Sequence, residues 1–131
     1  MIGLDTNVLL RFFAQDDKQQ SPLADATMAS LTTRNPGWIA VATVLDFVWA
    51  MSKSMRFPKP VVCNAIDRML TLDTIVIEQE EIVSSAVQQY RSTRADFADC
   101  LIAASARAAG CSKTVTFDRI AARDTGMELI V

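Results

Sequence analysis

The 131-residue sequence predicts an α/β fold in which helices cover both faces of a mostly parallel sheet. Two observations lead to this prediction. Short apolar, strand-like runs alternate with longer helix-like segments, which is the pattern of parallel strands joined by crossover helices. Half of the residues are hydrophobic and 21% are charged, as in a globular chain with a buried core. At this length we expect a single domain over residues 1–131.

The chain begins with a short strand followed by two helices. Ile2–Leu4 is apolar throughout and is expected to be a strand buried on both faces. Thr6 or Asn7 is then expected to cap a short apolar helix at Val8–Phe13. The polar residues that follow predict a loop, and Ser21-Pro22 predicts the start of the next helix, with proline at its first position.

A second strand and two more helices are predicted in the middle of the chain. Asn35-Pro36-Gly37 predicts a turn, after which Trp38–Val41 forms an apolar strand. Thr43 is expected to cap a helix that runs to about Ser54, because apolar residues recur there at near-helical spacing. A further amphipathic helix is predicted at Val61–Leu70 and is expected to cover the core.

The last third of the chain continues the alternation. Acids begin and arginines end the Glu80–Arg94 helix, as the helix dipole favours. The alanine-rich helix at Asp96–Ala109 is closed by Gly110. The remaining elements are strands at Thr74–Ile77, Lys113–Thr116 and Glu128–Val131, and a short helix at Arg119–Arg123.

Charge and cysteine content exclude several classes of protein. A net charge of −2 argues against nucleic-acid binding by bulk charge, so such binding requires a local basic patch. Cys63, Cys100 and Cys111 are odd in number, lack metal-type spacing and are expected to be small buried hydrophobes. Without a signal peptide, they favour a reducing cytoplasm. No apolar run is long enough for a membrane span.

Acidic residues recur at comparable places in the predicted fold. Asp5 and Asp118 each follow a predicted strand, and neighbouring parallel strands would bring them close together. Asp96 and Asp99 lie three residues apart, on adjoining parts of one helix face. Asp46 sits early in its own helix. If these elements converge on one edge of the sheet, the carboxylates share one cleft.

Such a cluster favours a bound divalent cation. The chain has no histidine, so catalysis must rely on carboxylates, and the usual nitrogen ligands of zinc and non-haem iron are missing. Carboxylates a few ångströms apart raise each other's pKa, and a bound cation reverses this. Oxygen ligands suit Mg²⁺ and Mn²⁺, which activate water for phosphodiester hydrolysis.

Each acid also has a purely structural explanation. Asp5, Asp96 and Asp118 each precede a predicted helix and are plausible caps, and for Asp96 capping is preferred over direct metal ligation. Asp46 fits a solvated helix position. Taken singly, the structural explanation is preferred for every acid except Asp5. The functional interpretation therefore depends on four acids at matching positions in the fold.

Three motifs resemble those of the PIN-domain ribonucleases, and among these the VapC-type toxins of bacterial toxin–antitoxin pairs. They are Leu4–Arg11 (LDTNVLLR), Asp96–Ala104 (DFADCLIAA) and Thr116–Asp118 (TFD). Any one motif is weak, but their order and spacing over the whole chain make the resemblance specific. It implies a three-layer α/β/α sandwich with a central, mostly parallel sheet of about five strands.

The resemblance also implies an activity and its residues. It implies an Mg²⁺- or Mn²⁺-dependent endoribonuclease acting on structured RNA such as tRNA or rRNA, usually a homodimer silenced by a cognate antitoxin protein. The catalytic acids map to Asp5, Asp46, Asp99 and Asp118, of which Asp5, Asp99 and Asp118 are the metal ligands. Supporting residues map to Thr6, Asn7, Asp96 and Thr116.

One position departs from the family pattern. The second acid of the family is usually glutamate, whereas Ala42–Trp49 (ATVLDFVW) carries Asp46 there. Aspartate keeps the charge but is one methylene shorter, which matters in a site that depends on precise placement. The alternative reading is therefore a catalytically attenuated PIN-like module that binds RNA or a partner.

Two other acidic parallel-sheet classes fit less well. A haloacid-dehalogenase-like phosphatase requires a second aspartate where Asn7 stands, and a receiver domain requires a phosphorylatable aspartate where the third strand ends in Ile77-Glu78.

For RNA contacts, the best basic candidates are Lys53, Arg56 and Lys59, which cluster around Phe57. Trp49 and Phe47 are candidates for base stacking, although Trp49 falls on the apolar side of its helix and is expected in the core.

Overall fold

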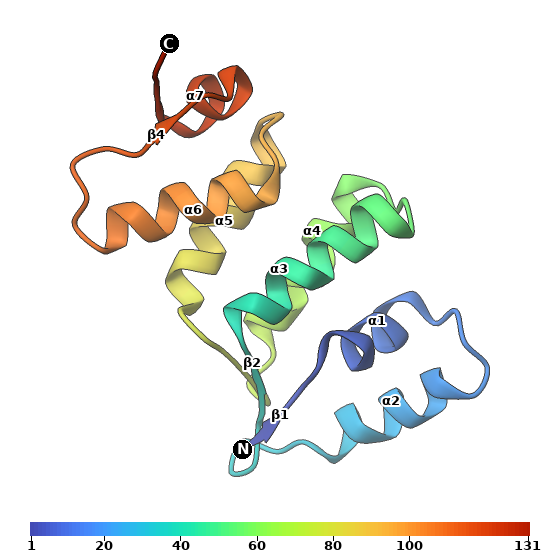
Figure 1. The fold of residues 1–131 in the computed structure, drawn as a ribbon. Coiled ribbons are helices and arrows are strands. Elements are labelled where there is room, and N and C mark those ends of the chain that lie inside the picture. The colour runs from blue at the N-terminus through green and yellow to red at the C-terminus, as the bar shows by residue number, and fades with distance from the viewer. The chain divides into compact units, whose positions relative to one another are not determined.

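The computed structural model describes residues 1–131, which form two compact units, Met1–Glu78 and Gln79–Val131 (Figure 1). The five strands lie in a three-stranded sheet in the first unit and a two-stranded sheet in the second. Every strand pair is parallel. The predicted α/β class and its parallel pairing are therefore confirmed, and the five strands are divided between two sheets where one central sheet was predicted. The prediction of one domain over the whole chain remains a prediction.

In the first unit, the strands alternate with helices along the chain. The elements are β1 (Ile2–Gly3), α1 (Thr6–Ala14), α2 (Gln20–Ser30), β2 (Gly37–Ile39), α3 (Val41–Trp49), the π-helix η1 (Ala50–Ser54), α4 (Lys59–Thr71) and β3 (Ile75–Ile77). The sheet order is β1-β2-β3. Because the strands are parallel, their carboxyl ends share one edge, and α1 and α3 both begin there.

Neighbouring side chains pack so closely against Gly37 that they leave little room for a β-carbon at this position. A β-carbon at Gly37 would lie 2.7 Å from Leu4 Cδ1 and 2.9 Å from Leu31 Cδ1. Both distances are shorter than a van der Waals contact, so no other residue fits without displacing its neighbours. The glycine of the predicted turn is thus the first residue of β2 and is fixed by packing.

The core of the first unit lies between the helices and the sheet. Its fully buried side chains include Leu9, Ile39, Phe47 and Ile66. The Phe13 and Phe47 rings meet edge to face, with centroids 5.6 Å apart, and join α1 to α3. As predicted, α4 covers this core with one apolar face, formed by Val62, Cys63, Ala65, Ile66 and Met69.

Several local predictions for the first unit are wrong. The N-cap of α1 is Asp5, so Thr6 and Asn7 lie in its first turn. Similarly, α3 begins at Val41, and its N-cap is Ala40, three residues before the expected cap at Thr43. Strand β1 is exposed rather than buried on both faces, because it has a single strand neighbour in its sheet.

The prediction that Trp49 lies in the core is also wrong, because 63% of this residue is exposed. The buried face of α3 and η1 is formed by Val44, Phe47, Val48 and Met51, at the spacing of one helix side. Trp49 falls outside that spacing. The helix does continue to Ser54 as predicted, but its last turn is a π-helix.

The second unit consists of two long helices that pack against each other and a smaller part formed by two strands and a short helix. Its elements are α5 (Glu80–Ser92), α6 (Phe97–Ala108), β4 (Val115–Thr116), α7 (Arg119–Thr125) and β5 (Glu128–Leu129). Tyr90 of α5 meets Phe97 of α6 edge to face, with ring centroids 5.7 Å apart. Ala103, Ala121 and Met127 form a small buried cluster that joins α7 to α6. None of the helices in either unit has the length and apolar character required to cross a bilayer.

Candidate active site

Asp5 follows β1 after one intervening residue, Leu4, at the carboxyl edge of the first sheet. Its backbone is extended, and its carbonyl oxygen accepts hydrogen bonds from the N–H groups of Val8 (3.1 Å) and Leu9 (3.4 Å). The carboxylate is exposed and makes no capping hydrogen bond to α1. Asp5 thus begins the helix through its backbone, and its side chain plays no part in the cap.

Asp46 lies later in its helix than predicted. Since α3 begins at Val41, Asp46 is in the second turn, where its side chain is exposed. The acid at the start of α3 is instead Glu78, which directly follows β3. Its Oε1 accepts a hydrogen bond of 3.0 Å from the Val41 N–H. Glu78 was not among the predicted site residues, and its position directly after a predicted strand was the available signal for it.

Three predicted acids of the second unit influence one another. Asp96 is the N-cap of α6, Asp99 lies in the first turn of that helix, and Asp118 stands between β4 and α7. Burial raises the pKa of Asp99, and the negative charges of Asp118 and Asp96 raise it further. The structure therefore brings these carboxylates close enough for their charges to interact.

Asp118 is fixed in place by two hydrogen bonds. Its Oδ1 accepts a bond of 2.9 Å from the Ala121 N–H, so the side chain caps α7. Its own N–H donates a bond of 3.0 Å to Thr116 Oγ1 at the end of β4. The structural explanation for Asp118 is therefore correct, and Thr116 Oγ1 holds the backbone N–H at this position. The cap uses one carboxylate oxygen and holds the group in a single orientation.

The chemistry of these side chains fits a hard divalent cation. Within neither unit are three or more acidic or cysteine side chains arranged to hold a metal ion. Mg²⁺, however, keeps several waters and is often bound by only one or two carboxylates together with substrate phosphates. Asp99 and Asp118 could act as such a pair, since burial and then the charge of Asp118 raise the pKa of Asp99 and a cation would favour its ionised form.

Two of the basic residues differ in how their surroundings hold them. Arg11 donates to Gln20 Oε1 (2.8 Å) and to Asp16 (3.1 Å), which gives it a structural role between α1 and α2. In contrast, Arg56 is exposed, and its φ of 58° places it in the left-handed region, where a side chain is strained. Arg56 occupies the turn after η1, in the predicted basic cluster.

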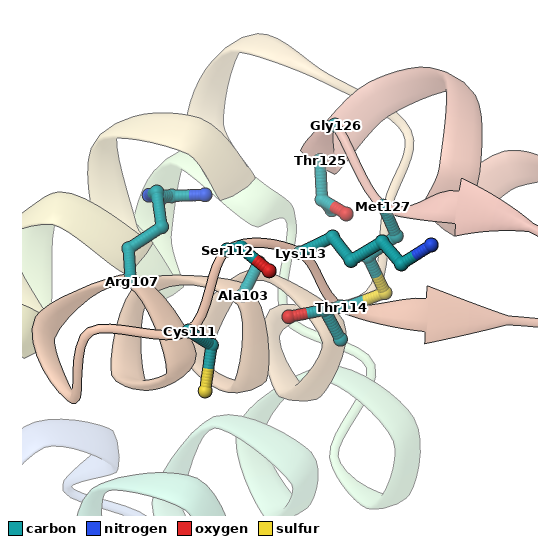
Figure 2. Close-up of a pocket in the computed structure, with 9 residues that line it drawn as sticks. All are labelled: Ala103, Arg107, Cys111, Ser112, Lys113, Thr114, Thr125, Gly126 and Met127. Atoms are coloured by element: carbon teal, nitrogen blue, oxygen red, sulfur yellow. The ribbon is translucent and has the colours of Figure 1, made fainter.

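A separate pocket in the second unit contains none of the predicted acids. It has a volume of about 240 Å³ and lies where β4 begins, whereas Asp118 follows the other end of that strand (Figure 2). The Arg107 and Lys113 side chains diverge on opposite sides of it, and Lys113 pairs with Glu128 at 3.2 Å. Cys111 on its rim is exposed, which corrects the expectation that all three cysteines are buried.

Comparison with known proteins identifies the family. The PIN domain model matches residues 2–125, a range that includes every predicted site residue. No curated protein matches the chain. PIN domains are α/β proteins and are generally nucleases that use divalent metals. The chain belongs to the PIN domain family.

Proposed function

We propose that the protein is an Mg²⁺- or Mn²⁺-dependent endoribonuclease that hydrolyses RNA phosphodiester bonds through Asp5, Asp46, Asp99 and Asp118. The observation that supports this most directly is the raised pKa of Asp99, caused by burial and by the charges of Asp118 and Asp96. Repulsion of this kind is costly in the free protein and is relieved by a cation. Membership of a family of metal-dependent nucleases supports the same conclusion.

In this proposal Asp5, Asp99 and Asp118 hold the metal, and Asp46 is the fourth catalytic acid. A bound Mg²⁺ or Mn²⁺ supplies an activated water and stabilises charge on the leaving oxygen. Thr116 fixes the backbone of Asp118, and the cap on α7 restricts its carboxylate.

Three supporting residues stand beside metal ligands. The negative charge of Asp96 adds to the repulsion that raises the pKa of Asp99, and a bound cation relieves this repulsion. Thr6 and Asn7 form the first turn of α1, directly after Asp5, and support its position. These roles rest on the order of residues in the motifs and on the interactions given above.

The biological setting is proposed from the three motifs that resemble VapC-type toxins. In that setting the protein is the cytoplasmic toxin of a toxin–antitoxin pair, forms a homodimer, and cleaves a tRNA or rRNA. A cognate antitoxin protein silences it. The single domain of residues 1–131 belongs to the same proposal, because the metal ligands come from both ends of the chain.

A second candidate is an attenuated PIN-like module that binds RNA or a partner protein. The observation in its favour is Asp46, which is one methylene shorter than the usual glutamate. Because α3 fixes the backbone at this position, the shorter side chain cannot be offset by a local shift of the chain without disturbing Phe47, which is fully buried next to it.

Cleavage of a total RNA pool by antitoxin-free protein tests the proposal. Reactions contain Mg²⁺, Mn²⁺ or EDTA, and Asp5→Asn is the inactive variant. Asp73→Asn is the matched control, because Asp73 is an exposed acid in the turn before β3. Discrete products that require metal, persist in Asp73→Asn and vanish in Asp5→Asn support the nuclease. Folded protein that binds Mn²⁺ but cleaves nothing supports the attenuated module.

A further inference from the structure

The outer face of α3 and η1 presents one exposed stripe. Ala42, Asp46, Trp49 and Lys53 follow one another at intervals of four, three and four residues and are all exposed. These intervals place them on the same side of the helix. We name these four residues the α3 stripe. Trp49 is its only large apolar side chain, and 63% of it is exposed.

Packing of the hydrophobic core does not account for a tryptophan at position 49. Phe47, its near neighbour in sequence, is fully buried, as is Val44. The helix therefore already buries the side that faces the sheet, and Trp49 stands on the opposite side, in contact with solvent. Exposing an indole ring forfeits a large hydrophobic gain, so an exposed tryptophan beside a charged site favours a binding role.

Two cationic residues follow Trp49 along the chain. Lys53 is on the α3 stripe, and Arg56 is displayed by the turn after η1. Two backbone hydrogen bonds hold that turn: the Met55 N–H donates to the Ala50 carbonyl (2.8 Å) and the Phe57 N–H to the Met51 carbonyl (2.9 Å). The left-handed backbone at Arg56 is thus held between two hydrogen-bonded residues, and the turn displays the Arg56 side chain to solvent.

We infer that Trp49 is a substrate-positioning residue that stacks on a base of single-stranded RNA, with the phosphates of the strand running toward Arg56. The inference rests on the proposed function, since Asp46 is then a catalytic acid. A separation of three residues places Trp49 about 4.5 Å further along the helix axis than Asp46. A base held there positions the neighbouring phosphodiester for cleavage.

The chemistry of the α3 stripe favours RNA over a second copy of the chain. A stable protein interface buries about 800 Å² on each partner, with an apolar centre. One tryptophan supplies about 150–250 Å² of that, and the other members of the stripe are an alanine and two charged residues. An isolated aromatic ring next to cations is instead the usual combination in proteins that bind single strands.

Tryptophan fluorescence gives a direct test that needs no catalysis. Trp38→Phe leaves Trp49 as the only tryptophan, because the chain has two. In EDTA, an oligouridylate RNA is expected to quench Trp49 emission. Relative to wild type, Trp49→Ala should bind this RNA about tenfold more weakly, or about 1.4 kcal/mol, and Trp49→Phe should retain most of the affinity.

Salt dependence separates stacking from charge. Trp49→Ala should leave the slope of log affinity against log salt unchanged, because it removes no phosphate contact. Arg56→Gly should reduce the magnitude of that slope by about 0.7, the value for one contact to a single strand. Glycine is chosen because it tolerates the φ of 58° at this position, so the fold is preserved.

Three results would overturn the inference: no quenching of Trp49 by the RNA, equal affinities of wild type and Trp49→Ala, or a change of Trp49→Ala from dimer to monomer in sedimentation. The last would make Trp49 a subunit contact. Cleavage by wild type in Mg²⁺, measured separately, reports on the proposed function alone. If RNA quenches Trp49 fluorescence but the protein has no nuclease activity, the proposed function is refuted and Trp49 remains an RNA contact.

Discussion

Replacing Asp118 by asparagine and by alanine separates the two roles of this side chain. Asp118 Oδ1 caps α7 by accepting the Ala121 N–H at 2.9 Å. An asparagine oxygen accepts the same bond, and Asn and Asp are about equally good N-caps. Alanine has no acceptor. Both substitutions remove the negative charge that raises the pKa of Asp99.

The magnitudes follow from these contacts. Loss of an N-cap costs about 1 kcal/mol, and for a chain of this size about 1 kcal/mol lowers Tm by roughly 4 °C. Asp118→Ala should therefore melt roughly 4 °C below wild type in EDTA. Asp118→Asn should melt at or slightly above the wild-type temperature, because it keeps the cap and removes repulsion with Asp99.

Circular dichroism melting in EDTA and RNA cleavage in Mg²⁺ are the two assays. Both variants should lose cleavage, by about 100-fold or more, since a proposed metal ligand is missing. A Tm for Asp118→Asn as low as that of Asp118→Ala would refute the capping argument. Wild-type cleavage by Asp118→Asn would refute the site assignment.

Three further predictions concern Asp99, Asp46 and Gly37. The folded state raises the pKa of Asp99 above its ordinary value of 3.8, so its ionisation destabilises the fold progressively as pH rises through that range. Asp99→Asn should thus raise the free energy of unfolding at pH 7 in EDTA by about 0.3–1 kcal/mol, with no gain below pH 3.8 in urea titrations. Asp46→Glu should cleave RNA several-fold faster than wild type, and equal rates would show that the shorter acid is tolerated. Gly37→Ala should cost about 1–3 kcal/mol in urea unfolding, because its β-carbon would lie 2.7 Å from Leu4 Cδ1; an unchanged midpoint would mean that the leucine moves freely.

The sequence predicted elements well where the signal is local and periodic. The helix predicted at Val61–Leu70 is found at Lys59–Thr71, and the one predicted at Asp96–Ala109 is found at Phe97–Ala108. Helix starts were less predictable. Asp5, Thr6 and Asn7 all have capping side chains, and only the extended backbone at Asp5 decides which residue begins α1.

Interactions between distant residues could not be read from the sequence. Glu78 binds the start of α3 from a position 37 residues away, and no local pattern indicates that contact. The exposure of Trp49 was missed because hydrophobicity alone does not reveal which of two adjacent helix faces is buried. An interaction of Asp99 with Asp118 was expected only if their elements met at one edge of the sheet, because the argument from neighbouring strands concerned Asp5 and Asp118.

The π-helix after α3 holds one residue more than a regular turn would. The Met55 N–H bonds to the Ala50 carbonyl, five residues back. Because the extra residue is taken up within one wider turn, deleting one residue from Ala50–Ser54 and restoring an α-turn would leave the direction of the downstream chain nearly unchanged. The same deletion in the regular part of α3 would turn all later residues by about 100°. A change of one residue in length is therefore tolerated at η1 and not elsewhere in the helix.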